Sequence, residues 1–224
     1  MNKIFVSDMD GTFLDTSSNV PHDFNDYLSE IKENDMHFVL ASGRALYNMK
    51  HKMVNYLKDI DFISDNGAFV SVEGKTIYKS FMDKEIVLDL IEIGESLEKT
   101  SIVLVTENTA YVDLYNEEHR IMLYEYYLDF EVVKDLRDID EDVVKVTYLN
   151  LNNAEQLYHK TLYPKFKQDV NIVLAGNIWI DAMNQNVNKS EGLQILLDYY
   201  DLNKEQVYAF GDYHNDIELL EKAG

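Results

Sequence analysis

The stretch Ile4-Phe5-Val6-Ser7-Asp8-Met9-Asp10-Gly11-Thr12 decides the fold of this chain, because an apolar run ends there in two carboxylates and a turn. Short apolar runs of this kind are typical of buried parallel strands. Ligands of open α/β sheets bind beyond the carboxyl ends of such strands. We therefore expect Asp8 and Asp10 at a site that binds a metal and divides nucleophile and acid–base roles between two acids. The alternative is a polar strand end that closes in a turn, which Asp and Gly also favour.

The composition indicates a protein with a sizeable core and one large or two modest domains. Its 224 residues are 46% hydrophobic, and the absence of cysteine excludes disulfides, thiolate zinc sites and cysteine nucleophiles. The first residues lack a basic segment followed by an apolar one, and no apolar run approaches the length of a membrane span. We therefore expect a soluble, cytoplasmic protein.

The net charge of −21 bears on the partners of the chain. So acidic a chain repels nucleic acid and anionic membrane surfaces, and no basic cluster offsets the repulsion. Neither is expected as a partner. An anionic substrate would need a local cationic site, supplied by a metal or by one well-placed lysine.

Strands and helices alternate through the first part of the chain. The predicted elements are a strand over 4–8, a helix from Phe24 to about Asn34, a strand over 37–41, a helix with Leu46, Met49, Met53, Val54 and Leu57 on one face, and a strand over 61–64. The same alternation returns late, with a helix from Lys189 and a strand over 206–210. This order predicts an α/β fold, a parallel sheet with right-handed crossovers.

Residues 82–184 are predicted to form a second domain, inserted into the first. Strand pairs flank turn residues at 107–109 and 176–177, and helices are expected over 83–98 and 153–166. Strands that pair through hairpins indicate an antiparallel α+β unit, although the signals over 115–142 are mixed. The remaining segments, 1–81 and 185–224, would then form the Rossmann-like parallel core.

Polar residues follow three predicted strands of the core, and a lysine begins a helix near the same edge. Parallel strands bring their carboxyl ends to one side of a sheet, so these residues converge on one pocket. Several carboxylates around one lysine repel each other without a cation, and oxygen ligands with no His or Cys point to Mg²⁺. The residues are Asp8, Asp10, Ser42, Asp212, Asn215, Asp216 and Lys189.

At this point the chain resembles a known family. The segments DMDGT (8–12), ASGR (41–44), NKSEG (188–192) and GDYHND (211–216) resemble, in order, the four signature motifs of haloacid dehalogenase-like phosphatases. The NGA segment at 66–68 and the large insertion resemble the Cof-type branch, sugar-phosphate phosphatases that carry an α+β cap. The resemblance covers essentially the whole chain.

The resemblance implies a catalytic role for each acid. Asp8 would attack phosphorus and form an aspartyl-phosphate, while Asp10 would protonate the leaving oxygen and then activate the hydrolytic water. Mg²⁺ would be held by Asp8, the backbone carbonyl of Asp10, and Asp212. Asp216, with Asn215, would orient Lys189 and the metal-bound water.

The resemblance also implies a set of substrate-binding residues, each with a structural alternative. Ser42 and the Gly43 amide would bind the phosphoryl oxygens, with Lys189 offsetting their charge, and Asn66 and Asn215 would complete the set. Ser42 equally suits a helix cap, and Asn66-Gly67 a hairpin turn.

Other conspicuous residues are expected to be structural. We expect Arg44 in a surface ion pair rather than against substrate, and His214 exposed and chemically idle. Trp179 and the tyrosine-rich run at 124–127 are expected in the cap core rather than as a platform for substrate.

Two features depart from the family pattern. Ser190 follows the motif lysine where the family usually has glycine, which a helix start tolerates. The sequence also stops at Gly224, where Cof-type proteins continue through another strand and helix, so we expect an unpaired sheet edge. The protein would then be a truncated product, be marginally stable, or cover that edge by self-association, and we expect a monomer or a weak homodimer.

The function expected from these residues is Mg²⁺-dependent hydrolysis of a small phosphorylated metabolite, a phosphomonoester such as a sugar phosphate. The cap would open and close about two crossings near residues 80 and 186 to exclude water. A phosphosugar mutase with the same nucleophile is one alternative. A catalytically idle regulatory or binding protein of the same fold is the other.

Overall fold

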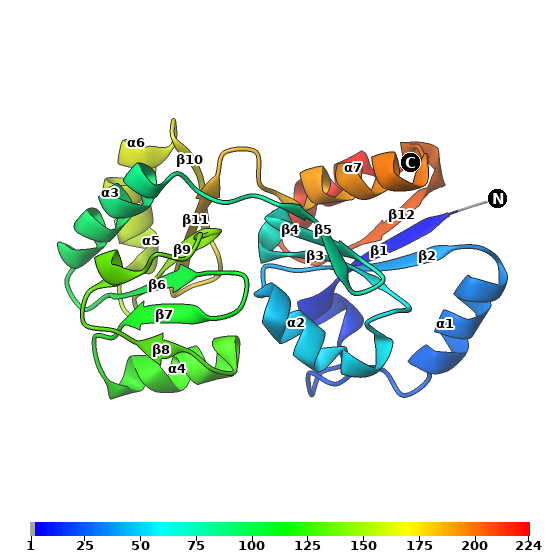
Figure 1. Cartoon of the computed structure of the whole chain (residues 1–224), viewed down its shortest axis with the longest axis horizontal. Coiled ribbons are helices and arrows are strands. Elements are labelled where there is room, and N and C mark those ends of the chain that lie inside the picture. The colour runs from blue at the N-terminus through cyan, green and yellow to red at the C-terminus, as the bar shows by residue number, and fades with distance from the viewer. Residues whose placement is uncertain (1–2) are drawn as a thin grey trace. The chain divides into compact units, whose positions relative to one another are not determined.

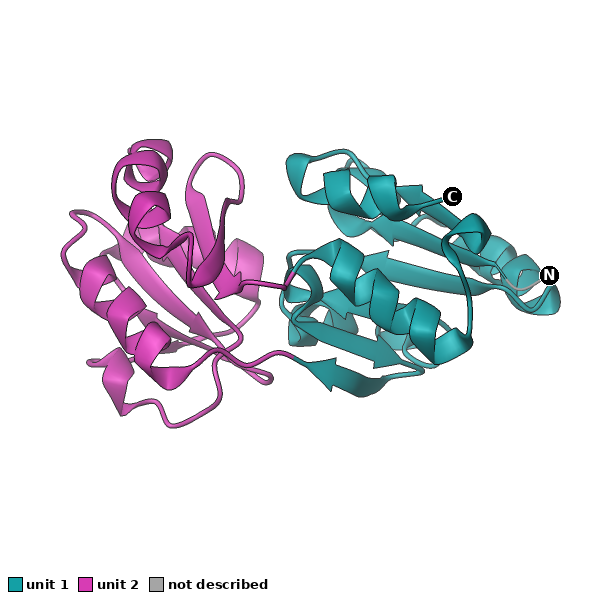
Figure 2. Cartoon of the chain, turned by 90° about the horizontal axis from the view of Figure 1, so that it is seen from above, with its two compact units in different colours: residues 1–79, 188–224 teal, residues 80–187 magenta. Residues whose placement is uncertain are grey.

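A computed structural model describes residues 3–224, and the chain divides into two units (Figure 2). The core unit comprises Met1–Lys79 and Asn188–Gly224, and the inserted unit comprises Ser80–Val187. Each unit has one six-stranded sheet. Among the described residues, no helix is both long enough and apolar enough to cross a membrane.

The sheet of the core unit has the strand order β12-β1-β2-β3-β4-β5. Its first four strands run parallel, and β4 and β5 follow as an antiparallel hairpin. The predicted α/β class with a parallel sheet is therefore confirmed. The strands are β1 (Ile4–Asp8), β2 (His37–Ala41), β3 (Asp61–Ser64), β4 (Phe69–Val72), β5 (Lys75–Lys79) and β12 (Val207–Phe210).

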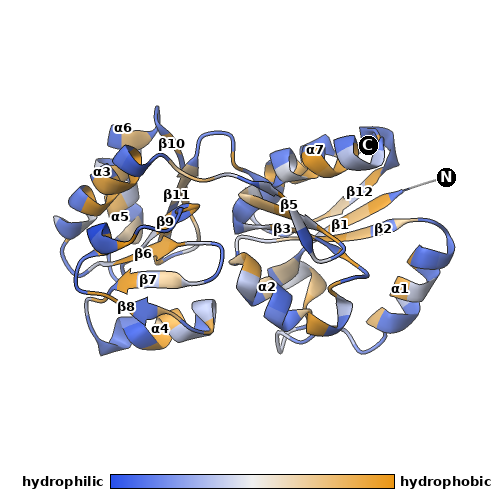
Figure 3. Cartoon of the chain, viewed as in Figure 1, coloured by the Kyte–Doolittle hydropathy of each residue, from blue (hydrophilic) through white to orange (hydrophobic). Residues whose placement is uncertain are grey.

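Helices cover both faces of this sheet, as Figure 1 shows. They are α1 (Phe24–Glu33), α2 (Leu46–Lys52), α7 (Lys189–Tyr200) and α8 (Ile217–Lys222). Successive strand side chains point to opposite faces. On one face Val39 and Ile63 pack with Leu193 of α7, and on the other Leu40 and Phe62 pack with α1 and α2. The central strands β1, β2 and β3 are largely buried on both faces, and β1 and β2 accordingly read as nearly continuous apolar runs (Figure 3). Most side chains of the edge strand β5 are exposed.

The second predicted helix is shorter than its apolar spacing suggested. It ends at Lys52, and a 3₁₀ turn follows over Val54–Tyr56. Met53 is fully buried, but Val54 is 62% exposed because the chain changes direction between them. The prediction that Val54 shares the apolar face is therefore wrong.

The inserted unit has an antiparallel sheet with one parallel pair, β7 with β8, at its edge. Its core packs on the face covered by α3 and the segment from α5 to α6. The elements are α3 (Lys84–Glu95), β6 (Ser101–Val105), β7 (Ala110–Asp113), α4 (Glu117–Tyr127), β8 (Glu131–Val132), β9 (Lys145–Leu149), α5 (Ala154–Leu157), α6 (Tyr163–Phe166), β10 (Val170–Leu174) and β11 (Trp179–Asn184).

Helix α4 corrects the prediction for the tyrosine-rich run. Residues His119, Leu123 and Tyr127 recur every four positions and are buried. Trp179 is buried as expected, but Tyr124 and Tyr126 are 49% and 46% exposed, because helical geometry turns them away from that face. Only part of the run therefore belongs to the core.

A buried carboxyl lies at the start of β3. Asp61 accepts hydrogen bonds from the Tyr200 hydroxyl at 2.8 Å and from the Glu73 amide at 3.3 Å. The His37 ring stacks on Tyr200 with ring centroids 3.7 Å apart. Burial raises the pKa of Asp61 to about 6, which outweighs the lowering by its two hydrogen bonds. The ionised form therefore destabilises the folded state above that pH.

We expect Asp61→Asn to stabilise the protein at pH 8. The pKa of Asp61 is higher in the folded than in the unfolded state, so the wild type loses stability as pH rises through about 6. The amide oxygen of the asparagine would keep the hydrogen bond from the Glu73 amide, and the Tyr200 hydroxyl would reverse to accept from the amide nitrogen. The buried charge is removed, which raises the free energy of unfolding by about 1–2 kcal/mol at pH 8 and by less at pH 5. Urea denaturation at the two pH values measures this, with the exposed Glu30→Gln as control; an equal effect at both would contradict the assignment.

Candidate active site

The loop after β1 is held against the loop after β12. Gly11 has a φ of +87°, and a Cβ atom there would lie 2.5 Å from Oδ2 of Asp212. Thr12 donates through Oγ1 to Oδ1 of Asp212 at 3.2 Å. Glycine is needed at this position both for the backbone conformation and for the close approach of the carboxylate. Asp8 and Asp212 are thereby brought to one edge of the sheet.

A buried lysine lies between two carboxylates at this edge. Lys189 is the first residue of α7, whose N-cap Asn188 accepts a hydrogen bond from the Glu191 amide. Its ammonium group is 1% exposed and donates to Oδ1 of Asp8 and to Oδ1 of Asp216, each at 2.5 Å. An ammonium so completely removed from water requires such partners.

Asp216 has a second function in the same loop. Its Oδ2 accepts the backbone N–H groups of Asp212 at 3.2 Å and Tyr213 at 3.1 Å. One carboxylate therefore orients both the lysine and the backbone that carries Asp212. His214, in the same turn, is exposed, as expected.

Three carboxylates at this edge fit a divalent cation. Asp8, Asp212 and Asp216 each offer an oxygen, and these atoms lie within 4.8 Å of one another. With Lys189 they carry a formal charge of −2, and all the ligand atoms are hard oxygens, which suits Mg²⁺. The side chain of Asp10 is not in this cluster. The ligand predicted from Asp10 is its backbone carbonyl, and the cluster of side-chain oxygens does not test that prediction.

The electrostatics of Asp8 reflect its burial. Desolvation raises the pKa of Asp8 to about 6, although the attraction of Lys189 and its hydrogen bond act in the opposite direction. The neighbouring carboxylates of Asp216 and Asp10 raise the pKa further. The folded protein therefore bears an electrostatic cost for the ionised Asp8, which a bound cation would remove.

The other predicted binding residues lie at the ends of β2 and β3 and in the loop after β12. Ser42 is buried, and its Oγ accepts the Arg44 amide at 3.1 Å. Asn66, at φ +55°, donates its amide to the Ser42 carbonyl and accepts at Oδ1 from Nδ2 of Asn215 at 3.2 Å. A Cβ atom at Gly43 would lie 3.2 Å from Oδ1 of Asn66. The predicted binding residues Ser42, Gly43, Asn66 and Asn215 therefore lie next to one another.

Asn66-Gly67 also occupies the connection between the antiparallel strands β3 and β4, so its turn role is present in the structure. Gly67 has a φ of +105°, and a Cβ atom there would lie 2.3 Å from the Asn188 carbonyl oxygen. The same turn therefore shapes the hairpin and allows the start of α7 to pack closely against it.

The ion pair expected for Arg44 is present, and its partner is Asp10. Its Nε donates to Oδ2 of Asp10 at 2.7 Å and its Nη2 donates to Oδ1 at 2.8 Å. The Arg44 side chain is 18% exposed and that of Asp10 48%. The predicted surface ion pair is therefore a fork on one of the candidate catalytic acids. The adjacency of β1 and β2 in the sheet brings the two loops together, and the linear sequence contains no signal for it.

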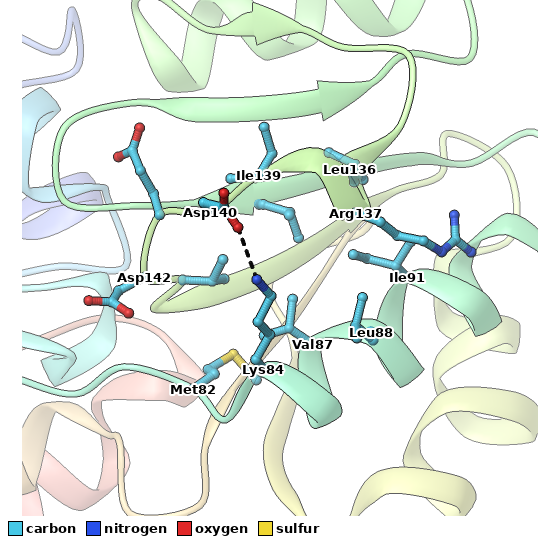
Figure 4. A pocket seen from close by; sticks show the side chains of 13 residues that line it. Met82, Lys84, Val87, Leu88, Ile91, Leu136, Arg137, Ile139, Asp140 and Asp142 are labelled. Carbon is cyan, nitrogen blue, oxygen red and sulfur yellow. Dashed lines mark hydrogen bonds and ion pairs between the residues drawn. The ribbon is translucent and has the colours of Figure 1, made fainter.

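The inserted unit has a pocket whose lining is largely apolar, unlike the carboxylate cluster of the core unit (Figure 4). Its lining includes the apolar side chains of Met82, Val87 and Ile91. Lys84 reaches Asp140 at 3.1 Å, and Arg137 binds Glu95 through both terminal nitrogens. Both cations are thus already paired, and the pocket includes none of the predicted site residues.

Comparisons with known proteins match almost the whole chain. A family model described as haloacid dehalogenase-like hydrolase matches residues 5–224, a range that includes every predicted site residue. The chain is 27% identical over 227 residues to a 5-amino-6-(5-phospho-D-ribitylamino)uracil phosphatase of Escherichia coli (strain K12), covering 99% of this chain and 83% of that protein.

Solved structures show the same architecture. SMU.1108c from Streptococcus mutans UA159 superposes with a TM-score of 0.90 at 26% identity, covering 100% of this chain and 85% of that one. The haloacid dehalogenase subclass IIB sugar phosphatase BT4131 superposes with a TM-score of 0.83 at 22% identity, covering 99% of this chain and 85% of that one. The second likeness concerns the fold alone.

We expect Mg²⁺ to raise the melting temperature of the wild type by about 5 °C or more at saturating concentration, because it binds the folded carboxylate cluster. Asp8→Asn removes one ligand and one buried charge. It should melt higher than the wild type in EDTA at pH 8, since the pKa of Asp8 is raised in the folded state. It should also lose most of the Mg²⁺ shift.

Differential scanning fluorimetry with Mg²⁺ or EDTA measures both effects. Asp26→Asn, on the exposed face of α1, is the matched control and should behave as the wild type. A Mg²⁺ shift of undiminished size in Asp8→Asn would rule out this cluster as the metal site.

Proposed function

Because the chain belongs to the haloacid dehalogenase-like hydrolase family, we propose that it is a Mg²⁺-dependent phosphatase that hydrolyses small phosphomonoesters through an aspartyl-phosphate on Asp8. The observation that carries this proposal is the buried triad of Asp8, Lys189 and Asp216, in which one ammonium donates to both carboxylates at 2.5 Å. The curated relative from Escherichia coli is named a phosphatase.

The proposed reaction has two halves. In the first, an oxygen of Asp8 attacks phosphorus, the ester P–O bond breaks, and Asp10 gives its proton to the leaving oxygen. In the second, water attacks the phosphorus of the aspartyl-phosphate and passes a proton to Asp10. The bond to Asp8 breaks, inorganic phosphate leaves, and both acids return to their starting forms.

Neutral and cationic donors bind the phosphoryl group in this proposal. The Ser42 hydroxyl accepts the Arg44 amide at 3.1 Å, and such a hydroxyl can still donate its own proton. Ser42 and the Gly43 amide donate to phosphoryl oxygens, Asn66 and Asn215 complete the donor set, and Lys189 offsets the developing negative charge.

Asp8 and Asp212, with the backbone carbonyl of Asp10, would hold Mg²⁺, and Asp216 adds a further carboxylate to the cluster. When bound, the ion neutralises charge on the phosphoryl oxygens and on the acids around Lys189. The convergence of the three carboxylate oxygens within 4.8 Å supports this assignment.

The substrate is proposed to be a sugar phosphate or a related phosphorylated polyol. The name of the Escherichia coli relative contains a phosphoribityl group, which is a phosphate ester of a sugar alcohol. The inserted unit is proposed to act as the cap that selects the part of the substrate beyond the phosphate and excludes water during reaction.

We expect the wild type to hydrolyse p-nitrophenyl phosphate with Mg²⁺ and to stop when chelator is in excess. Asp8→Asn removes the nucleophile and should lower kcat by more than about 10³-fold. Steady-state release of p-nitrophenol measures this, with circular dichroism to establish folding and Asp26→Asn as the matched control. A folded wild type without turnover, or an Asp8→Asn variant of full activity, would contradict the proposal.

A panel of sugar and polyol phosphates then tests the substrate class. We expect release of inorganic phosphate in amounts equal to the substrate consumed. An isomeric sugar phosphate in place of free phosphate would instead identify a mutase.

A further inference from the structure

We propose that Arg44 is a positioning residue for Asp10, braced by Asn48, and that it acts mainly in hydrolysis of the aspartyl-phosphate rather than in its formation. This inference rests on the proposed phosphatase function. It concerns a side chain that the sequence indicated only as a member of a surface ion pair.

The guanidinium of Arg44 holds both oxygens of one carboxylate. The distances of 2.7 Å from Nε to Oδ2 and 2.8 Å from Nη2 to Oδ1 describe a two-pronged pair. Such a pair fixes the plane of the carboxylate as well as its position, which a lysine ammonium does not do. Asp10 otherwise has a half-exposed side chain in a turn. Its orientation therefore depends on Arg44.

Arg44 is itself anchored on three sides. Its backbone carbonyl accepts the Asp65 amide at 2.9 Å, and its backbone amide donates to Oγ of Ser42 at 3.1 Å. Its Nη1 donates to Oδ1 of Asn48 at 3.4 Å, and Asn48 lies 2% exposed in α2. A buried amide in the first turn of α2 thus steadies the guanidinium. The chain of contacts runs from α2 through Arg44 to Asp10.

The fork matches the form of Asp10 that exists between the two half-reactions. Once Asp10 has given its proton to the leaving oxygen, it is a carboxylate, and a guanidinium fork binds a carboxylate. In the second half-reaction that carboxylate must accept a proton from the attacking water. This step requires that the carboxylate lie within hydrogen-bond reach of the water and be correctly oriented toward it. Arg44 supplies that orientation.

The first half-reaction depends less on Arg44 when the leaving group is good. p-Nitrophenolate leaves without protonation, so formation of the aspartyl-phosphate from p-nitrophenyl phosphate needs no acid. Loss of the fork should therefore slow the second half-reaction selectively with this substrate. A general loss of structure would slow both.

Stopped-flow kinetics with p-nitrophenyl phosphate and Mg²⁺ separate the two halves. In Arg44→Lys we expect the steady-state rate to fall about 10-fold to 100-fold, while the rate of the first p-nitrophenolate burst changes less than about 3-fold. Asn48→Ala should show the same pattern at smaller size. Acid quenching should trap more phosphorylated protein in both variants than in the wild type.

Arg137→Lys is the matched control, because Arg137 makes a similar fork on Glu95 in the inserted unit, with distances of 2.6 and 2.7 Å. It should leave both phases unchanged. An equal fall of both phases in Arg44→Lys and Asn48→Ala, or a change confined to KM, would overturn the inference while the phosphatase proposal stands. A wild type without turnover would instead overturn the phosphatase proposal itself.

Discussion

The contact of one buried ammonium with two carboxylates organises this protein. Lys189 donates to Asp8 and Asp216 at 2.5 Å, and its side chain is almost completely removed from water. Removing both partners would leave an uncompensated buried charge, which is strongly destabilising. The contact joins the end of β1, the start of α7 and the loop after β12, so three distant segments depend on it.

The parallel sheet makes that contact possible. With β1 between β12 and β2, the carboxyl ends of adjacent strands place Asp8, Ser42 and Asp212 at the same edge. Two glycines allow close packing at this edge. Gly11 leaves room for the Asp212 carboxylate, and Gly67 leaves room for the start of α7. The same negative charge that burial makes costly in Asp8 is what a divalent cation stabilises. Binding of the proposed Mg²⁺ would therefore be coupled to the stability of the fold.

The two units divide the chemistry of the chain. The core unit carries the convergent carboxylates, whereas the ion pairs described in the inserted unit, such as Arg137 with Glu95, tie helices and loops together. In the core unit a similar arginine fork holds Asp10 instead. The same interaction is structural in one place and lies on a candidate catalytic acid in the other, because only the surrounding residues give it a role.

The sequence by itself determined the order of elements in the core unit and the residues at its strand ends. Apolar runs fixed β1, β2 and β3 because both faces of these strands are buried, and DMDGT and GDYHND mark the turns that follow β1 and β12. Only the tertiary structure decided that Arg44 pairs with Asp10, that Asp216 joins the carboxylate cluster, and that Tyr124 and Tyr126 lie at the surface. The reason is physical: periodicity records which faces are buried, whereas side-chain partners depend on strand order, helix rotation and rotamers, which are set by contacts between residues distant in sequence.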